Sequence, residues 1–249
     1  MAEAKHLENA PITEAIIDFR IKPKEGFRVD KFLELKSALA KEYPKVQKQQ
    51  LIEGGFEIAP GKPVKVSKTE GIGGYWFISS DGLNLAQFRV DGFTYNRFKP
   101  YTDWEAVFPE AWRLWGVFKD TGAVEFVTRI ATRFINRLTL PSPVSDLDRY
   151  LTVPPQTPAG ISGNTANFLT RILVDIKEIG AAASITQALD KSVDPNTIVV
   201  ILDIDVFVQK QFRLAIDDSV MIKTFSGLRD LKNRIFFSSV TDETLRLFE

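Results

Sequence analysis

The stretch VEFVTRIATRFINRLTL, residues 124–140, places arginine at every fourth position, as Arg129, Arg133 and Arg137. A spacing of four puts side chains on one face of a helix and equally on one face of a strand. The even positions are mainly apolar, and β-branched Val, Ile and Thr recur throughout, which disfavours a helix and suits a pleated strand. We therefore predict a strand with one apolar face and one arginine face.

Two interpretations of this arginine row stay open. The favoured one is a cross-strand salt-bridge ladder, because acidic residues concentrate on other predicted strands; the candidate partners are Glu14, Asp18, Asp175, Asp203 and Asp205. The alternative is an anion-binding surface for a nucleic-acid backbone, a nucleotide or an acidic protein segment. Arg97 and Lys99 would join that surface, because they stand among aromatic residues on which bases can stack.

Period-two alternation predicts further strands on both sides of residues 124–140. In residues 75–99, the pairs Asp81-Gly82 and Asp91-Gly92 each separate two β-rich runs. Asp-Gly favours the positive φ angles of a type I′ turn, so we predict a three-stranded meander there. A polar strand at 45–58, interrupted by Gly54-Gly55, is typical of an exposed sheet edge with a bulge.

Apolar residues at helical spacing predict helices over residues 30–43 and 102–122. Thr102 or Asp103 would cap the second of these helices. Pro109 would either kink it or divide it into two shorter helices.

The predicted element order is β-α-β-βββ-α-β, then a linker, then βββ-α. Residues 141–165 hold five of the thirteen prolines, which predicts a Pro-rich linker between an N-terminal unit at 7–140 and a C-terminal unit at 166–249. Helices segregated from antiparallel meanders indicate an α+β fold, with helices packed on one sheet face. The second unit resembles a shortened copy of the first, which would make two similar halves.

Composition argues against several classes of chemistry. Lys+Arg and Asp+Glu are both 32, so no net charge draws the molecule towards nucleic acid or anionic lipid. The chain has no cysteine and one histidine, His6. Disulfides, thiolate and imidazole metal sites and His-based catalysis therefore lose their usual residues. No apolar signal segment stands out, so we expect a cytoplasmic protein without membrane contact, cofactor or bound metal.

One catalytic alternative remains. Asp175-Ile176-Lys177 puts a carboxylate and a lysine on one strand face, and Asp148 lies upstream. This is loosely similar to the Asp…(Asp/Glu)-x-Lys pattern of restriction-type nucleases, in which carboxylates hold Mg²⁺. The pattern is short and recurs by chance, so a solvated strand face is the favoured interpretation.

Three short motifs span most of the chain: NAPITEAI at 9–16, RFINRL at 133–138 and KNRIFFSSVT at 232–241. In their order and spacing the chain resembles a family of uncharacterised, sporadically distributed bacterial proteins. The resemblance implies a bacterial protein of scattered occurrence, as is typical of accessory systems such as phage defence or toxin–antitoxin modules.

These observations leave three functional hypotheses. The favoured one is a non-catalytic binding protein of such an accessory system, which recognises a protein partner encoded nearby, or an anionic ligand, through the arginine-bearing sheet. The second is a nucleic-acid or nucleotide binder that uses the five basic residues named above. The third is a Mg²⁺-dependent nuclease around Asp175 and Lys177. For the C-terminal helical region at 220–248, the favoured interpretation is that it covers the sheet, and the alternative is that it packs against a second copy in a homodimer.

Overall fold

The computed structural model describes residues 7–57, 65–141, 144–157 and 165–249, and for residues 51–57, 65–70 and 144–146 the backbone alone. The fold is α+β, as predicted. Within the described residues, nine strands form one antiparallel sheet in the order β2-β3-β4-β5-β1-β6-β9-β8-β7.

The strands are β1 (Ile12–Pro23), β2 (Lys45–Glu57), β3 (Lys65–Ile78), β4 (Asn84–Arg89), β5 (Gly92–Phe98), β6 (Val124–Pro141), β7 (Leu169–Ile176), β8 (Ala181–Asp190) and β9 (Thr197–Phe212). The α-helices are α1 (Leu35–Leu39), α2 (Trp104–Asp120), α3 (Asp218–Ser239) and α4 (Asp242–Arg246). The 3-10 helices are η1 (Val29–Glu34), η2 (Val144–Arg149) and η3 (Lys177–Ile179).

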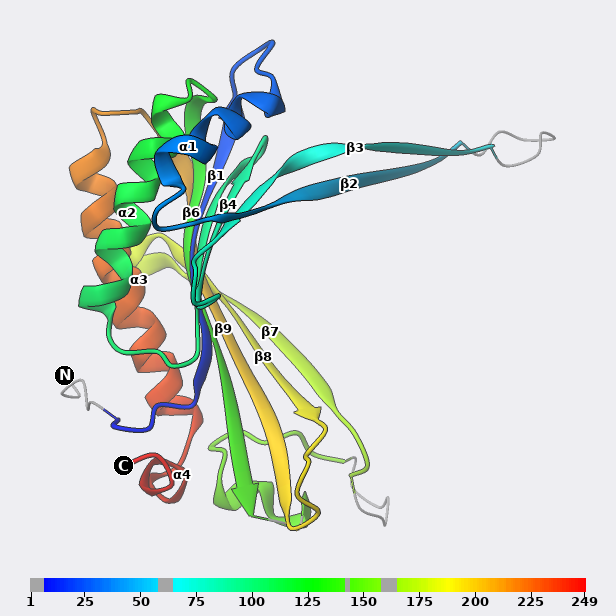
Figure 1. The fold of residues 1–249 in the computed structure, drawn as a ribbon. Helices are drawn as coiled ribbons and strands as arrows, with labels where there is room; N and C mark the ends of the chain where they lie inside the picture. The colour runs from blue at the N-terminus through cyan, green and yellow to red at the C-terminus, as the bar shows by residue number, and fades with distance from the viewer. Residues whose placement is uncertain (1–6, 58–64, 142–143, 158–164) are drawn as a thin grey trace.

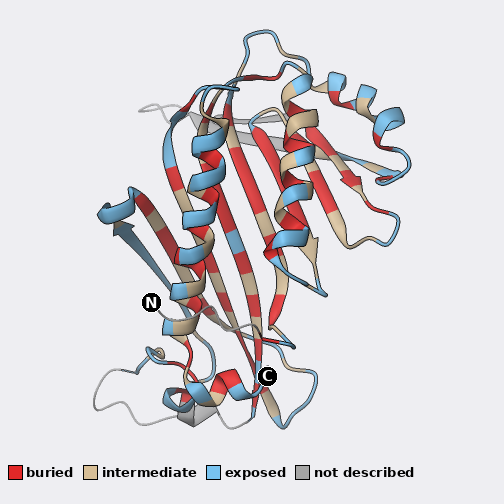
Figure 2. Ribbon diagram, turned by 90° about the vertical axis from the view of Figure 1, so that its left-hand side faces the viewer, coloured by how far each residue is buried: buried red, intermediate tan, exposed pale blue. Residues whose placement is uncertain are grey.

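The two long helices cover one face of the sheet (Figure 1). α2 packs against β5, and α3 packs against β6 and β9. Seen from the helix side, the outer faces of these helices are exposed and the strands beneath them are buried (Figure 2). Both ends of the sheet bend away from the helices, and the β2–β3 hairpin extends as an arm (Figure 1). Within the described parts of the chain, no helix combines the length and apolar character needed to cross a bilayer.

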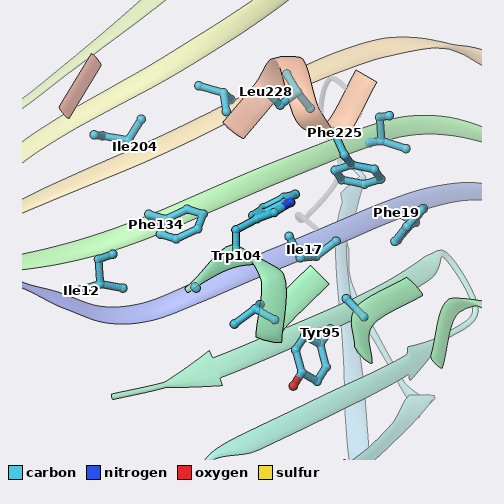
Figure 3. Packing of buried hydrophobic residues seen from close by; sticks show 14 of the residues in the cluster. Ile12, Ile17, Phe19, Tyr95, Trp104, Phe134, Ile204, Phe225 and Leu228 are labelled. Atoms are coloured by element: carbon cyan, nitrogen blue, oxygen red, sulfur yellow. The ribbon is translucent and has the colours of Figure 1, made fainter. Parts of the chain in front are cut away.

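The core between sheet and helices is rich in aromatic rings. Phe19 of β1 stacks on Trp115 of α2, with 4.2 Å between ring centroids, and lies 5.1 Å from the ring of Phe225 on α3. Phe134 of β6 lies beside Trp104 in the same layer (Figure 3). Burying a Phe side chain stabilises a fold by about 1.5–3 kcal/mol, so this cluster ties both helices to the sheet.

The predicted arginine strand is confirmed as β6. Its apolar positions Phe134 and Leu138 are fully buried, and it pairs antiparallel with β1 on one side and β9 on the other. Because β9 lies within residues 166–249, the two predicted units are joined in one continuous sheet. Within the predicted linker, η2 forms a turn of 3-10 helix and Leu151 bridges to Val240.

The predicted meander exists as β3, β4 and β5, but its turns are not of type I′. The turn between β4 and β5 ends at Asp91, and Gly92 is already the first residue of β5. Neither aspartate has a positive φ. Their side chains hold the turns instead: Asp81 Oδ1 accepts a hydrogen bond from the Leu83 amide at 2.9 Å, and Asp91 accepts one from Arg89 at 2.9 Å.

Two further local predictions are wrong in detail. β2 is an edge strand as predicted, but its irregularity lies between Gln49 and Gln50, whereas Gly54-Gly55 pairs regularly with β3. Glycine permits a bulge without requiring one.

The helix predicted over residues 30–43 is η1 followed by the short α1. It ends early, and Tyr43 beyond it donates a hydrogen bond to Glu110 at 2.7 Å.

The helix predicted over residues 102–122 is confirmed as α2. Asp103 caps it by accepting a hydrogen bond from the Ala106 amide at 2.6 Å. The helix runs unbroken through Pro109, so the predicted division into two helices does not occur. It ends before Gly122, whose φ of +78° stops the helical turn.

Candidate functional site

The arginine row of β6 lies on the sheet face that carries no helix, and its first member joins three strands. Arg129 binds Asp18 of β1 and Asp205 of β9, with nitrogen–oxygen distances of 3.1 and 2.8 Å. Its guanidinium also lies 4.4 Å from the ring centroid of Phe207. Burial raises the pKa of the Asp205 carboxyl, and the charge of Arg129 opposes that shift. The guanidinium is thus occupied by two carboxylates.

The other two arginines of the row are occupied as well. Arg133 donates hydrogen bonds of 2.8 and 2.6 Å to the two carboxylate oxygens of Asp203. This contact is the main cause of the raised pKa of Arg133. Arg137 binds Asp190 at the end of β8. The salt-bridge ladder is therefore confirmed at all three arginines, with Asp18, Asp203 and Asp205 as predicted partners and Asp190 as one that was not predicted. The other two predicted partners are not part of it, because Glu14 accepts a hydrogen bond from Asn96 and Asp175 forms no ion pair with the described residues.

Arg97 and Lys99 do not join this row. Arg97 shares with Tyr95 the helix-side face of β5, where it donates hydrogen bonds to Asn84 Oδ1 and to the Pro100 carbonyl, both at 3.2 Å. It lines a polar cavity of about 380 Å³. Lys99 follows β5 and is exposed. Arg97 and the β6 arginines therefore lie on opposite faces of the sheet.

The residues of the nuclease hypothesis lie at the surface. Asp175 is exposed on β7, Lys177 begins η3, and Asp148 is exposed in η2. Across residues 7–57, 65–141, 144–157 and 165–249, no three Asp, Glu, His or Cys side chains gather closely enough to hold a metal ion. Nothing in this arrangement favours the nuclease hypothesis.

Lys232 on α3 has an environment unlike that of these basic residues. Only 8% of it is exposed, because its side chain lies between α3 and β6, with Nζ 3.9 Å from the ring centroid of Phe134. No carboxylate of the described residues forms an ion pair with this ammonium group. A buried lysine without an acidic partner is rare in folded proteins because desolvating the charge is costly.

Lys232 lines a pocket of about 270 Å³ in which α2, α3, β6 and the N-terminal segment meet. Leu7 and Trp104 supply apolar walls. All three sequence motifs contribute to the lining, with Ala10, Pro11 and Ile12 from the first, Asn136 from the second, and Lys232, Asn233, Phe236 and Phe237 from the third. Segments more than a hundred residues apart in the chain are therefore brought together at one pocket.

Burial, and to a smaller extent the like charge of Arg229, lowers the pKa of Lys232 to about 7. Arg229 itself is engaged, because it binds Glu105 at 2.7 Å. Asn136, also in the pocket lining, donates its amide hydrogen to the Leu202 carbonyl at 2.9 Å. Lys232 is thus the cation in this pocket that still lacks a partner of opposite charge among the described residues.

Lys232 is not among the site residues predicted from the sequence. The available signal is its position on the helix: it follows Leu228 by four residues and precedes Phe236 by four, and both are buried. Positions four apart share a helix face, so a lysine occupies a core position of an amphipathic helix. No family model, curated protein or solved structure matches this chain.

Proposed function

We propose that this protein is a non-catalytic binding protein for a small organic anion, and that Lys232 pairs with the carboxylate or phosphate group of that ligand. The observation that carries the proposal is a buried ammonium group with no acidic partner, at the wall of a pocket. An anion placed beside Nζ would offset the cost of desolvating the lysine, because opposite charges attract strongly where water is excluded.

The walls of the pocket support a ligand with an apolar portion. Leu7, Ile12, Trp104 and Phe236 contribute apolar surface, and Asn233 contributes a polar group. The two carboxylates of the lining are already engaged, Asp103 by the Ala106 amide and Glu105 by Arg229. Ligand pockets typically combine such apolar walls with a few polar groups that fix orientation. A cavity of about 270 Å³ accommodates a small metabolite rather than a polymer.

The β6 arginines are poorer candidates for binding an anion than Lys232, because each of them already binds a carboxylate. A phosphate that bound Arg129 or Arg133 would have to displace carboxylates already held at 2.6–3.1 Å. No observation of the described residues favours the nucleic-acid hypothesis over ligand binding at Lys232. A role in phage defence or in a toxin–antitoxin module, and a protein partner encoded nearby, stay predictions that rest on the resemblance of the three motifs.

The experiment is a thermal-shift titration of the full chain with three probe anions: inorganic phosphate, acetate and hexanoate. A ligand that binds only the folded state stabilises it by RT ln(1 + [L]/Kd), or about 2.7 kcal/mol at a hundredfold excess over Kd. We expect at least one probe to raise the melting temperature of the wild type and of Lys223→Met. Lys223 is an exposed lysine of the same helix, so its variant is the matched control.

The Lys232→Met variant should fold and lose this response, because methionine keeps the volume and removes the charge. A response to hexanoate but not to phosphate would identify a carboxylate ligand, and the reverse a phosphate ligand. If Lys232→Met responds like the wild type, or if none of the three anions stabilises the wild type, the proposal is wrong.

A further inference from the structure

The strand β7 forms one edge of the sheet. It pairs with β8 in regular register over all eight of its residues, without a bulge. Its sequence, LTRILVDI, contains no proline and no lysine. Among the described residues, no strand pairs with its outer row of backbone groups. Natural edge strands usually carry lysine, proline or a bulge that prevents such pairing.

The side chains of β7 are apolar and exposed on both faces of the sheet. Ile172 and Val174 point to the helix side and are 55% and 38% exposed, whereas Leu173 points to the other side and is 67% exposed. The exposure on the helix side arises because α3 packs on β6 and β9, so the helix layer ends before β7. Contiguous exposed apolar groups of this kind mark an interaction surface.

The opposite edge of the sheet differs in chemistry. β2 presents Lys45, Gln47, Lys48 and Gln50, all exposed, over the part whose side chains are described. These residues protect an edge by charge and polarity. β7 also carries two charged residues, Arg171 and Asp175, but they are of opposite sign, so they do not repel an antiparallel second copy of the strand.

The sequence of β7 is complementary to itself when read antiparallel about Leu173. In that register Arg171 stands opposite Asp175 of the second copy on one face, and Ile172 stands opposite Val174 of the second copy on the other. A two-fold axis repeats each contact, as in isologous dimers. Opposite charges and apolar pairs directly across two strands are the contacts that stabilise a sheet.

Arg171 and Asp175 are both available for this pairing. Arg171 donates one hydrogen bond, from Nε to Ser184 Oγ at 2.8 Å, which leaves its two terminal nitrogens without an acceptor among the described residues. Asp175 is exposed and forms no ion pair with the described residues. Neither charge is held by the salt-bridge ladder of the same face.

We infer that β7 is a self-association surface, on which a second copy of this chain adds its own β7 antiparallel in the register centred on Leu173. The charges select this register. Centring the pair on Ile172 puts Arg171 opposite Leu173, and centring it on Val174 puts Arg171 opposite Lys177. The dimer extends the sheet across the two-fold axis and keeps the helices of both copies on the same face. The inference does not depend on the proposed ligand pocket.

The test is the mass of the full chain in solution, measured by sedimentation velocity over a concentration series. We expect a dimer for the wild type. Arg171→Asp and Asp175→Arg each place like charges opposite one another at two symmetric positions, and each should raise the dissociation constant about tenfold or more. The double variant Arg171→Asp/Asp175→Arg restores opposite charges with their order reversed and should restore the dimer.

Two apolar-to-lysine changes serve as a matched pair. Leu173→Lys brings two ammonium groups together at the two-fold axis and should give a monomer. Val193→Lys alters a residue that is fully exposed, in the β8–β9 loop, and should leave the dimer intact. All of these positions are exposed, and circular dichroism melts establish that each variant is folded.

A monomeric wild type at micromolar concentration overturns the inference. A dimer that persists in both Leu173→Lys and Arg171→Asp also overturns it and moves the interface elsewhere, for example to the C-terminal helices. A dimer that both single charge variants weaken and the double variant does not restore overturns the register.

Discussion

Positively charged side chains occupy two contrasting environments in this molecule. The β6 arginines each hold a carboxylate across the open face of the sheet. Lys232 lies under α3 against an aromatic ring and forms no ion pair with an acid of the described residues. The first arrangement serves stability, because paired charges offset their own desolvation, whereas the second weakens the fold. A costly group of this kind is a candidate for a binding role.

Replacing Lys232 should therefore stabilise the protein. We expect Lys232→Met to raise the free energy of unfolding at pH 6 by on the order of 1–4 kcal/mol, because an apolar side chain of similar length fills the same space without desolvating a charge. Urea denaturation at constant pH measures this change. A destabilised Lys232→Met would contradict the account of Lys232 as an unpaired buried cation.

The difference in the free energy of unfolding between Lys232→Met and the wild type should decrease as the pH rises above about 7. The pKa of Lys232 is about 7 in the folded protein, against 10.5 for an ordinary lysine. Between these values the unfolded chain keeps a proton that the folded chain has released, so wild-type stability rises with pH by up to about 1.4 kcal/mol per unit. Denaturation at pH 6, 8 and 10 should show the two proteins converging. A constant difference would mean that Lys232 does not titrate near neutrality.

Removing an arginine of the ladder should have the opposite effect. Arg133→Ala leaves Asp203, whose side chain is only 16% exposed, without its counter-charge. We expect a loss of roughly 1–3 kcal/mol, from the cost of a stranded partner. The double variant Arg133→Ala/Asp203→Ala should lose less than the sum of the two single variants, since the pair is coupled. An unchanged melting temperature, with loss of a ligand or partner, would show that Arg133 binds rather than stabilises.

At the residue scale, the sequence predicted the ladder better than the pocket. Asp18, Asp203 and Asp205 could be named as partners because each lies at alternate positions on a recognisable strand. Asp190 could not, because it follows an apolar run and its nearness to Arg137 depends on the register between β6, β9 and β8. Lys232 was noted only as the first residue of a motif, because its burial depends on which helix covers the sheet.

For the strands and helices, the presence of each element could be predicted from the sequence, but the geometry of the turns between them could not. The alternation of apolar and polar residues predicted a strand at 124–140, and β6 ends only one residue later, at Pro141. Asp103 correctly marked the start of α2. The β4–β5 turn was misplaced because an Asp-Gly pair can close a hairpin in more than one way. The carboxylate of Asp91 binds Arg20 and Arg89, and these contacts favour a turn that ends at the aspartate.

The β4–β5 turn requires a residue without a side chain at position 92, and this requirement can be tested. A Cβ at Gly92 would lie 2.1 Å from the Phe19 carbonyl oxygen, and its φ is +159°. We expect Gly92→Ala to destabilise the fold by about 2–4 kcal/mol, because backbone atoms of β1 and β5 must separate. Gly116→Ala is the control: that glycine lies within α2 with open space around it, so alanine should stabilise by about 0.5–1 kcal/mol. Equal effects of the two substitutions would contradict the close approach at Gly92.

At the scale of the whole molecule, the fold class was predictable but the continuity of the sheet was not. The order of strands and helices indicated α+β with helices on one face. Whether the strands of residues 7–140 and 166–249 share a sheet depends on the long-range pairing of β6 with β9, which local patterns do not specify. In the structure this pairing extends from Val127–Phe212 to Pro141–Thr197.

A shared sheet predicts that the two units unfold together. Separating them would expose the buried faces and the paired edges of both β6 and β9, so neither unit should melt alone. We expect one calorimetric transition whose measured enthalpy equals the van't Hoff enthalpy. Arg133→Ala, which weakens the β6–β9 contact, should shift that single transition to lower temperature without splitting it. Two resolved transitions in the wild type would contradict this expectation.

The lowered pKa of Lys232 also has a consequence for its reactivity. An ordinary surface lysine carries a proton at neutral pH and has no free electron pair for attack on an acyl group, whereas an amine with a pKa of about 7 is unprotonated in a large share of molecules. A limiting amount of an acylating reagent at pH 7 should therefore modify this one side chain ahead of the others. An anion in the pocket would favour the protonated amine and slow that modification, so the labelling rate at one position would report whether the pocket is occupied.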